Sequence, residues 1–189
     1  MKPLYFFSDK LLAATIIKIL PRSLSPNSIT AFRFLTVPVI FWLLSSEQYA
    51  WGSILFVFSA FTDALDGALA RASNRITDWG KLFDPLADKL LIGVTAAFLV
   101  TRFLSFWLAI AIVSAELLLI LFAYYHKYYR RRQVQANYLG KTKMVLQSFG
   151  LIVLFIAIIF NAPSFLRLAD GILVAAVIFA ILSFFGYRS

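Results

Sequence analysis

The chain has 189 residues, of which 61% are hydrophobic and 14% are charged. This composition excludes an ordinary soluble domain, which is nearer half apolar and a quarter charged. The chain has no cysteine, which excludes disulfide bonds and thiolate chemistry, and its single histidine excludes a histidine-rich zinc site. The net charge of +9 does not indicate nucleic-acid binding, because the basic residues flank apolar segments and form no tail.

The N-terminal segment 8–20 predicts a short amphipathic helix. Its apolar side chains fall on one side, Asp9, Lys10 and Lys18 fall elsewhere, and Pro21 ends the helix. Such a helix lies in the membrane interface and does not cross the bilayer. No cleavable signal peptide is expected, because lysines interrupt the apolar run and no small-residue cleavage pattern follows.

Six apolar segments follow, and each is long enough, or nearly so, to cross a bilayer, which takes about 20 residues. They are 28–46, 49–72, 83–101, 105–125, 143–160 and 165–186. The connections at 46–49 and 101–105 are very short and predict antiparallel hairpins, while 72–79 forms a polar connector. The predicted fold is therefore an all-α integral membrane protein. It forms a single domain over 1–189, in which six transmembrane helices (28–186) follow the interfacial helix.

The basic residues predict the orientation of the spans. When both termini lie on one side, that side holds all of the 18 lysines and arginines except Arg102 and Arg167. Basic residues near the ends of spans favour the cytoplasmic side. We therefore expect a multi-pass protein of the cell (inner) membrane, with both termini and residues 63–88 at the cytoplasmic face.

Four of the nine acidic residues lie in or beside the second and third spans: Asp63, Asp66, Asp84 and Asp88. The first two are three residues apart and the last two are four apart, so each pair shares a helix face. A charge at the centre of a membrane helix costs about 2.5–3.5 kcal/mol, and close carboxylates repel one another unless a cation neutralises them. Two helices that bring four oxygen ligands together suit a centre of two divalent cations, Mg²⁺ or Mn²⁺, for phosphoryl transfer.

Structural interpretations of the same residues stay open. Asp84-Pro85 is also the pattern of an N-cap followed by proline at the first helical position. Asp66 can pair with Arg71, and Asp78 fits a solvated loop. The small residues Gly67, Ala70 and Gly80 fit helix packing as well as the close approach of a nucleotide.

The full pattern over 63–88, D-x2-D-G-x2-A-R-x8-G-x3-D-x3-D, resembles the signature of the CDP-alcohol phosphotransferase family at every fixed position. Residues 26–33 also resemble the P-N-x-x-T-x-x-R pattern at the start of that family's first span. The organisation is similar too, with six spans after an interfacial helix. The resemblance implies transfer of a phosphatidyl group from CDP-diacylglycerol to an alcohol, with release of CMP.

The resemblance implies a role for each motif residue. Asp63, Asp66 and Asp84 would bind the metal ions, and Asp88 would complete the metal site and act as the general base. Arg71 would lie on the diphosphate. The whole CDP pocket would be lined by Asp66, Gly67, Ala70, Arg71, Asn27 and Thr30.

The acceptor alcohol is less clearly indicated. Gly140-Lys141-Thr142-Lys143 resembles the G-K-x-K segment of bacterial phosphatidylglycerophosphate synthases, and 80–89 is similar to that subfamily's G-x-x-x-D-P-x-A-D-K. A phosphorylated acceptor would then be bound by Lys141, Lys143 and Arg130, and the favoured acceptor is glycerol 3-phosphate. Inositol phosphate, or phosphatidylglycerol as in a cardiolipin synthase, are alternatives, and the two lysines can also be membrane anchors.

One departure bears on that prediction. The subfamily has an Arg-Glu pair in the fourth span, where this chain has Ala115-Glu116, and a further arginine is replaced within 123–125. The run from Arg130 to Arg132 can replace the lost arginines or anchor to lipid headgroups. Glu116 can shape the acceptor pocket or pair with Arg33.

The expected partners follow from this hypothesis: CDP-diacylglycerol, a small alcohol, membrane lipids and, by the family resemblance, a second copy of the chain in a homodimer. A function of another class is a divalent-cation transporter that uses the same carboxylates. Transport predicts acidic residues at mid-membrane depth on several spans, whereas here the motif acids lie on two spans near one face. The enzyme is therefore the favoured hypothesis.

Overall fold

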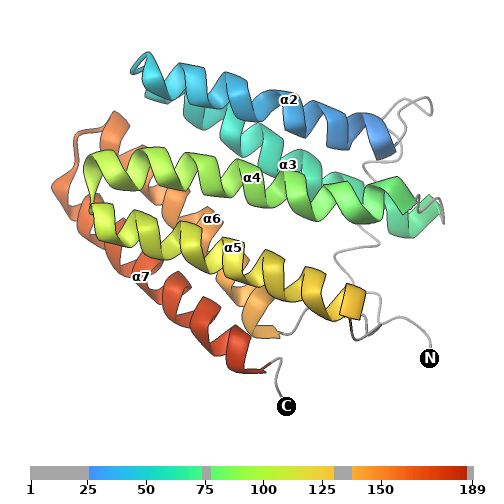
Figure 1. Ribbon diagram of the computed structural model, residues 1–189. Helices are drawn as coiled ribbons and strands as arrows, with labels where there is room; N and C mark the ends of the chain where they lie inside the picture. Colours follow the sequence, from blue (N-terminus) through green and yellow to red (C-terminus); the bar gives the residue numbers. More distant parts are fainter. Residues whose placement is uncertain (1–25, 74–77, 130–137, 187–189) are drawn as a thin grey trace. The chain divides into compact units, whose positions relative to one another are not determined.

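The structure, a computed structural model, describes residues 26–73, 78–129 and 138–186, with side chains described for 31–62, 86–122, 125 and 138–184. All regular secondary structure in these residues is helical (Figure 1). The helices are α2 (Pro26–Ser45), α3 (Tyr49–Ser73), α4 (Asp78–Phe103), α5 (Phe106–Tyr129), α6 (Tyr138–Ile159) and α7 (Pro163–Gly186). The expected interfacial helix at 8–20 lies outside the described residues.

Each of the six predicted apolar segments lies within or largely within one helix, which confirms the all-helical prediction. The helix ends differ from the predicted ones where polar residues extend a helix beyond its apolar part. The expected connector 72–79 is shorter than predicted, because α3 continues to Ser73 and α4 begins at Asp78. Asp78 is thus the first residue of α4, where a carboxylate interacts favourably with the helix dipole.

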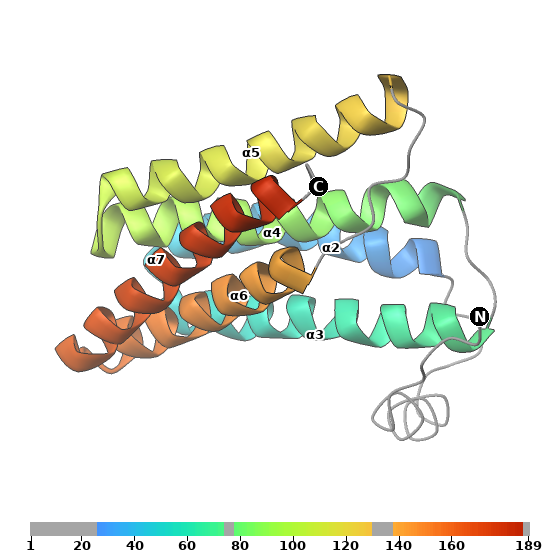
Figure 2. The same ribbon diagram turned by 90° about the horizontal axis from the view of Figure 1, so that it is seen from below.

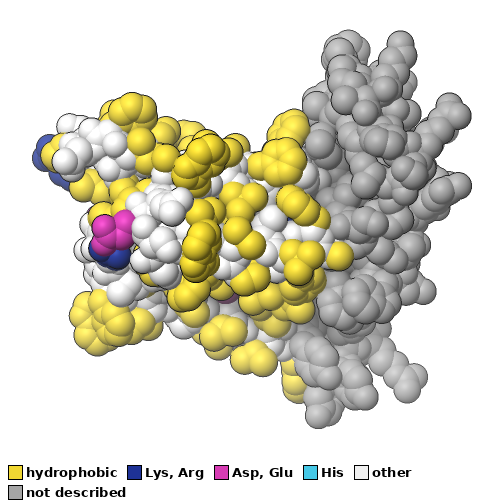
Figure 3. All heavy atoms as spheres, turned by 90° about the horizontal axis from the view of Figure 1, so that it is seen from above, with side chains coloured by type: hydrophobic (Ala, Val, Ile, Leu, Met, Phe, Trp, Pro, Cys, Tyr) yellow, Lys and Arg dark blue, Asp and Glu magenta, His cyan; other side chains and the backbone are white. Residues whose placement is uncertain are grey.

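Two helices are long and apolar enough to cross a membrane, at Tyr138–Ile159 and Pro163–Phe184, among the residues whose side chains are described. Shorter apolar helices lie at Ala31–Ser45, Tyr49–Thr62 and Phe106–Phe122. Large apolar side chains face outward, including Trp107 at 76% exposure and Phe160 at 74%. Figure 3 shows hydrophobic side chains over much of the described part of one face, with charged ones near one end. Exposed apolar surface of this extent is typical of a face that contacts lipid or another protein.

The chain divides into two compact units, one with the described residues among 1–39 and 54–91 and the other with those among 40–53 and 92–189. In the first unit, α2 packs against α3. The hydroxyls of Thr36 and Ser59 share a buried hydrogen bond of 3.0 Å, and the rings of Phe32 and Phe58 meet edge to face. Whether the chain behaves as the expected single domain stays a prediction.

In the second unit, α6 packs along α7, and both views show the two helices side by side (Figures 1 and 2). The packing is close at Gly150, where an added Cβ would approach the buried Leu173 side chain to 2.9 Å. The α6–α7 turn is closed by hydrogen bonds from the Ala162 N–H to the Ala157 carbonyl and from the Asn161 N–H to the Ile158 carbonyl. This is a Schellman cap, with Asn161 in the left-handed region at φ 52°.

The short connections predicted after α2 and α4 are also present, as residues 46–48 and 104–105. The α2–α3 turn uses the same cap as α6–α7, with Glu47 at φ 60°. Beyond this turn, Gly52 lets α3 approach Leu44 on α2, because a Cβ there would lie 2.9 Å from the leucine side chain. Both hairpins are therefore confirmed.

Candidate active site

The first half of the signature lies on an unbroken helix. Residues 63–71 lie in the last three turns of α3, so Asp63 and Asp66 share a face and Arg71 follows further along the same helix. Gly67 and Ala70 lie between them in sequence. The side chains of these residues fall outside those that the structure describes, so their roles as metal and CDP ligands stay predictions.

The second half of the signature lies near the start of α4. Asp84 and Pro85 are inside the helix, which begins at Asp78, so the N-cap interpretation of this pair is wrong. A cap residue precedes the first turn, whereas Asp84 comes more than one turn later. Proline has no N–H, so the carbonyl of Lys81 cannot receive the usual helical bond at Pro85. Asp88 follows Asp84 by one turn, and its side chain is half-buried.

The two halves of the signature lie in the same compact unit. Only residues 74–77 separate the end of α3 from the start of α4, so these helix ends are at most roughly 18 Å apart. Four carboxylates are a ligand set that fits Mg²⁺ or Mn²⁺. Among the side chains that are described, no group of three or more Asp, Glu, His or Cys residues could hold a metal ion, and Asp63, Asp66 and Asp84 lie outside that search. The metal site therefore stays a prediction.

The start of α2 carries the third part of the family pattern. Asn27 and Thr30 lie in its first turns, with side chains outside the described set. Arg33, one turn later, is completely buried. The orientation prediction counted Arg33 among the basic residues of the cytoplasmic side. Its burial shows that the guanidinium is not a solvent-exposed anchor.

The two lysines predicted to bind the acceptor have different surroundings on α6. Lys141 is exposed, and its Nζ lies 6.0 Å from the centroid of the Tyr138 ring. Lys143 is buried and donates a hydrogen bond from Nζ to Oε1 of Glu116 on α5. Lys143 is therefore not a surface anchor, whereas Lys141 is compatible with either prediction. Arg130 lies outside the described residues.

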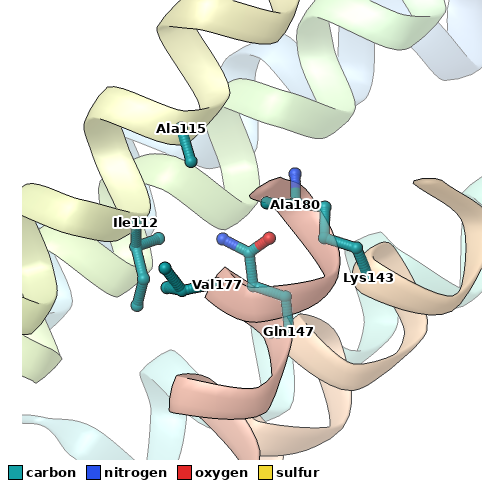
Figure 4. Close-up of a pocket in the computed structure, with 7 residues that line it drawn as sticks. Ile112, Ala115, Lys143, Gln147, Val177 and Ala180 are labelled. Carbon is teal, nitrogen blue, oxygen red and sulfur yellow. The ribbon is translucent and has the colours of Figure 1, made fainter. Parts of the chain in front are cut away.

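Glu116 has Lys143 as its partner within the second unit, and its pairing with Arg33, which lies in the first unit, stays a prediction. The alternative, that Glu116 helps to shape a pocket, fits a narrow recess between α5, α6 and α7, which Lys143 lines. Figure 4 shows Lys143 and Gln147 extending from α6 toward residues of α5 and α7. The recess is lined by Ile112, Ala115, Lys143, Gln147, Ala176, Val177 and Ala180.

Gln147 is a recess residue that the sequence did not single out. It lies one turn after Lys143 on the same face of α6, and its side chain is 2% exposed. Its Oε1 has no hydrogen-bond partner among the described residues, and neither does Oε2 of Glu116. The sequence feature that could have identified Gln147 is its position as a single amide residue, four residues after Lys143, in an otherwise apolar helix. Buried polar groups are costly unless hydrogen-bonded, so such a residue usually has a structural or functional partner.

Comparison with known proteins connects these features. The family model for CDP-alcohol phosphatidyltransferases matches residues 23–185, which include the three parts of the pattern and the recess. The chain belongs to this family. The match covers most of the chain.

Three relatives from this family illustrate the similarity. A Bacillus subtilis protein named CDP-diacylglycerol–glycerol-3-phosphate 3-phosphatidyltransferase is 34% identical over 87% of this chain and 93% of its own length. A Rickettsia typhi protein of the same name is 41% identical over 41% of this chain, and the chain spans 45% of that relative's length. A Streptomyces coelicolor cardiolipin synthase (CMP-forming) is 31% identical over 68% of this chain and 64% of its own length. The chain spans less than half the length of four such relatives from Rickettsia and Wigglesworthia.

Proposed function

We propose that this CDP-alcohol phosphatidyltransferase transfers a phosphatidyl group from CDP-diacylglycerol to glycerol 3-phosphate, forming phosphatidylglycerophosphate and CMP. The observation that carries the proposal is the complete signature from Asp63 to Asp88, on two continuous helices of one compact unit. The name of the Bacillus subtilis relative, matched over most of both chains, supports the choice of acceptor.

The proposed chemistry assigns the carboxylates distinct tasks. Asp88 accepts the proton of the acceptor hydroxyl, whose oxygen then attacks the lipid-side phosphorus of the diphosphate. The bond between that phosphorus and the CMP oxygen breaks, and CMP leaves. Two divalent cations held by Asp63, Asp66, Asp84 and Asp88 would neutralise the diphosphate charge and make CMP a better leaving group.

The remaining site residues bind the two substrates. Arg71 contacts the diphosphate, and the cytidine side of the pocket is formed with the small residues of α3 and the start of α2. These CDP-binding residues are Asp66, Gly67, Ala70, Arg71, Asn27 and Thr30. Lys141, Lys143 and Arg130 bind the acceptor. The exposed position of Lys141 supports a role at the acceptor's phosphate, because an exposed ammonium can meet an anion that arrives from water.

We also propose the topology that the basic residues predict: six spans in the cell (inner) membrane, with both termini and the signature at the cytoplasmic face, and a homodimer as the assembly. The outward-facing apolar side chains on the helices support a lipid environment. The cytoplasmic side is also where a water-soluble acceptor is available.

A second candidate acceptor is phosphatidylglycerol, as the similarity to the Streptomyces coelicolor cardiolipin synthase favours. In α5 the chain also has Ala115 where the phosphatidylglycerophosphate synthase pattern has arginine, so one charge for a phosphate is missing. Phosphatidylglycerol carries its phosphate as a diester with a single charge. It therefore needs less positive charge than glycerol 3-phosphate does.

Both candidates are tested by measuring CMP release by the purified full-length protein with CDP-diacylglycerol and Mg²⁺ or Mn²⁺. Glycerol 3-phosphate, phosphatidylglycerol and inositol phosphate are added separately. Metal-dependent release that requires glycerol 3-phosphate supports the proposal, and release only with phosphatidylglycerol supports the second candidate. The absence of metal-dependent release with every acceptor contradicts both.

A further inference from the structure

Two of the short turns are joined to each other within the second unit. The ion pair between Glu47 and Arg102 connects the α2–α3 turn to the last turn of α4, just before the α4–α5 turn. The rings of Tyr49 and Phe103 meet edge to face beside this ion pair, with their centroids 5.4 Å apart. The ends of α2 and α4 and the starts of α3 and α5 therefore lie at one end of the unit.

The α6–α7 turn lies at the same end, because α5 and α7 run in the same direction (Figure 1). Ile112 on α5 and Ala176 on α7 line the same recess. Further along both helices, the rings of Phe122 and Phe184 are in contact, with their centroids 5.0 Å apart. The three turns and the helix ends beside them are called the turn end, which comprises residues 42–51, 102–107 and 160–167.

Exposed tryptophans are a distinctive feature of the turn end. The three tryptophans whose side chains are described are Trp42, Trp51 and Trp107, and each lies within three residues of a helix end. Their side chains are exposed by 61%, 64% and 76%, and they come from three different helices. Tryptophan at such positions is typical of a membrane interface, where the ring contacts acyl chains and the indole N–H meets water or headgroups.

Two exposed arginines also belong to the turn end. Arg102 is in the last turn of α4, and Arg167 lies about one turn after the start of α7. A guanidinium has five N–H donors, so Arg102 keeps donors beyond the one that bonds Glu47. Guanidinium groups bind phosphate through paired hydrogen bonds, and a long arginine side chain can extend from an apolar helix to a polar layer. The positive charges of the turn end therefore match lipid phosphates.

The length of α6 sets a distance between the turn end and the next exposed charge on this helix. Lys141 is exposed at the start of α6, and Phe160, at the turn end, lies 19 residues later. At 1.5 Å per residue this is about 28 Å, close to the thickness of about 30 Å of a hydrocarbon core. Between these positions α6 exposes no charged side chain, because Lys143 is buried. The helix thus has the dimensions of a span between two interfaces.

We propose that the turn end lies in the headgroup region of a phospholipid bilayer, with the tryptophans at the boundary to the acyl chains and the arginines toward the phosphates. The inference rests on the proposed membrane topology and adds the residues that fix the depth of the second unit. In the proposed orientation, this is the leaflet opposite the cytoplasm. A lipid layer surrounds the end and so contacts tryptophans from three helices, whereas a second copy of the chain would cover one side.

The depth of Trp107 is measured by fluorescence in phosphatidylcholine proteoliposomes. Trp42→Phe/Trp51→Phe/Trp79→Phe leaves Trp107 as the single tryptophan. The acyl chains of the lipid carry a nitroxide quencher either near the headgroup or near the chain end. We expect the shallow nitroxide to quench Trp107 at least about twofold more strongly than the deep one.

The matched control moves the single tryptophan along the same helix. In the same background, Trp107→Phe/Leu118→Trp places it at an exposed position about 16 Å further into α5. The deep nitroxide should quench this protein more strongly. Equal or deeper quenching of Trp107 overturns the inference. Quenching of the control protein by lipid probes that do not reach Trp107 also overturns it, because protein, such as a second copy, would then cover the turn end.

A second measurement keeps every tryptophan. Because the chain has no cysteine, Gln48→Cys places a single thiol in the α2–α3 turn and Leu118→Cys places one at the control position. With a water-soluble maleimide on both sides of the bilayer, Gln48→Cys should react at least about tenfold faster, since the thiolate forms in water and not in hydrocarbon. Similar rates overturn the inference. Neither measurement uses the reaction, so a protein that releases no CMP contradicts the proposed activity and leaves this result independent.

Discussion

The ammonium of Lys143 on α6 donates a hydrogen bond to the carboxylate of Glu116 on α5, and both side chains are buried. The pair joins two helices of the second unit at positions 27 residues apart in sequence. It converts two costly buried charges into a neutral polar contact. It also prevents Lys143 from acting as a free positive charge.

Removing one partner of this pair should be costly. Glu116→Leu leaves the Lys143 ammonium buried without a counter-charge, and we expect it to lower the free energy of unfolding by about 3–5 kcal/mol. The double variant Glu116→Leu/Lys143→Met removes both charges and should lose less. Denaturant unfolding in detergent of wild type, the two single variants Glu116→Leu and Lys143→Met, and the double variant gives the coupling energy as a double-mutant cycle. Additive losses would show that the two side chains do not interact.

Lys141 should contribute to binding of the acceptor's phosphate. Lys141→Ala is expected to raise KM for glycerol 3-phosphate about tenfold, the usual scale for one charge-assisted hydrogen bond, with little change in kcat. The neighbouring variant Thr142→Ala, which removes an exposed hydroxyl bonded to the Tyr138 carbonyl, should keep the wild-type KM. An unchanged KM in Lys141→Ala would return that lysine to the role of membrane anchor.

Asp88 should be essential for turnover but not for donor binding. Asp88→Asn removes the base and one metal ligand, so we expect CMP release to fall below detection, while binding of CDP-diacylglycerol is largely retained. Donor binding is measured by calorimetry, and CMP release by the same assay as above. Asp170→Asn, on α7 of the other unit, is the control and should stay active. Near wild-type turnover in Asp88→Asn would refute its role as base.

A substitution in the cap between α6 and α7 should stabilise the protein. Asn161 adopts φ 52°, in the left-handed region of the backbone. This conformation is unfavourable for residues that carry a Cβ atom and nearly free of cost for glycine. Asn161→Gly is therefore expected to raise the free energy of unfolding by about 0.5–1 kcal/mol, and Asn161→Ala to lower it by a similar amount. Thermal unfolding of both variants beside wild type checks the sign. A stabilised alanine variant would be incompatible with the observed backbone.

Hydropathy predicted which segments are helices, because long apolar runs must satisfy their backbone hydrogen bonds within the helix. The helix ends were less predictable. α4 begins at Asp78, and Asp84 lies inside the helix, because helical hydrogen bonding continues past the last apolar residue and hydropathy does not detect it. Pro85 pointed to a helix start, yet α4 continues through it.

In the candidate site, too, some features could be predicted from the sequence and others could not. The motif residues on α3 and α4 could be picked out because they lie close together in sequence and their spacing matches helix periodicity. The pairing of Glu116 with Lys143 and the burial of Gln147 depend on how α5 packs against α6, which no local pattern encodes. From sequence alone, a lysine near the start of an apolar helix is interpreted as a membrane anchor, because its partners on other helices are not known.

The buried pair between α5 and α6 also has a consequence for how the protein enters the membrane during synthesis. In the proposed six-span topology, Glu116 leaves the ribosome well before Lys143, so α5 would reach the bilayer with an uncompensated charge. A lone charge at the centre of a helix costs about 2.5–3.5 kcal/mol on insertion. If α5 is a span as proposed, its stable integration would depend on the arrival of α6, and the two helices are expected to leave the translocation machinery together.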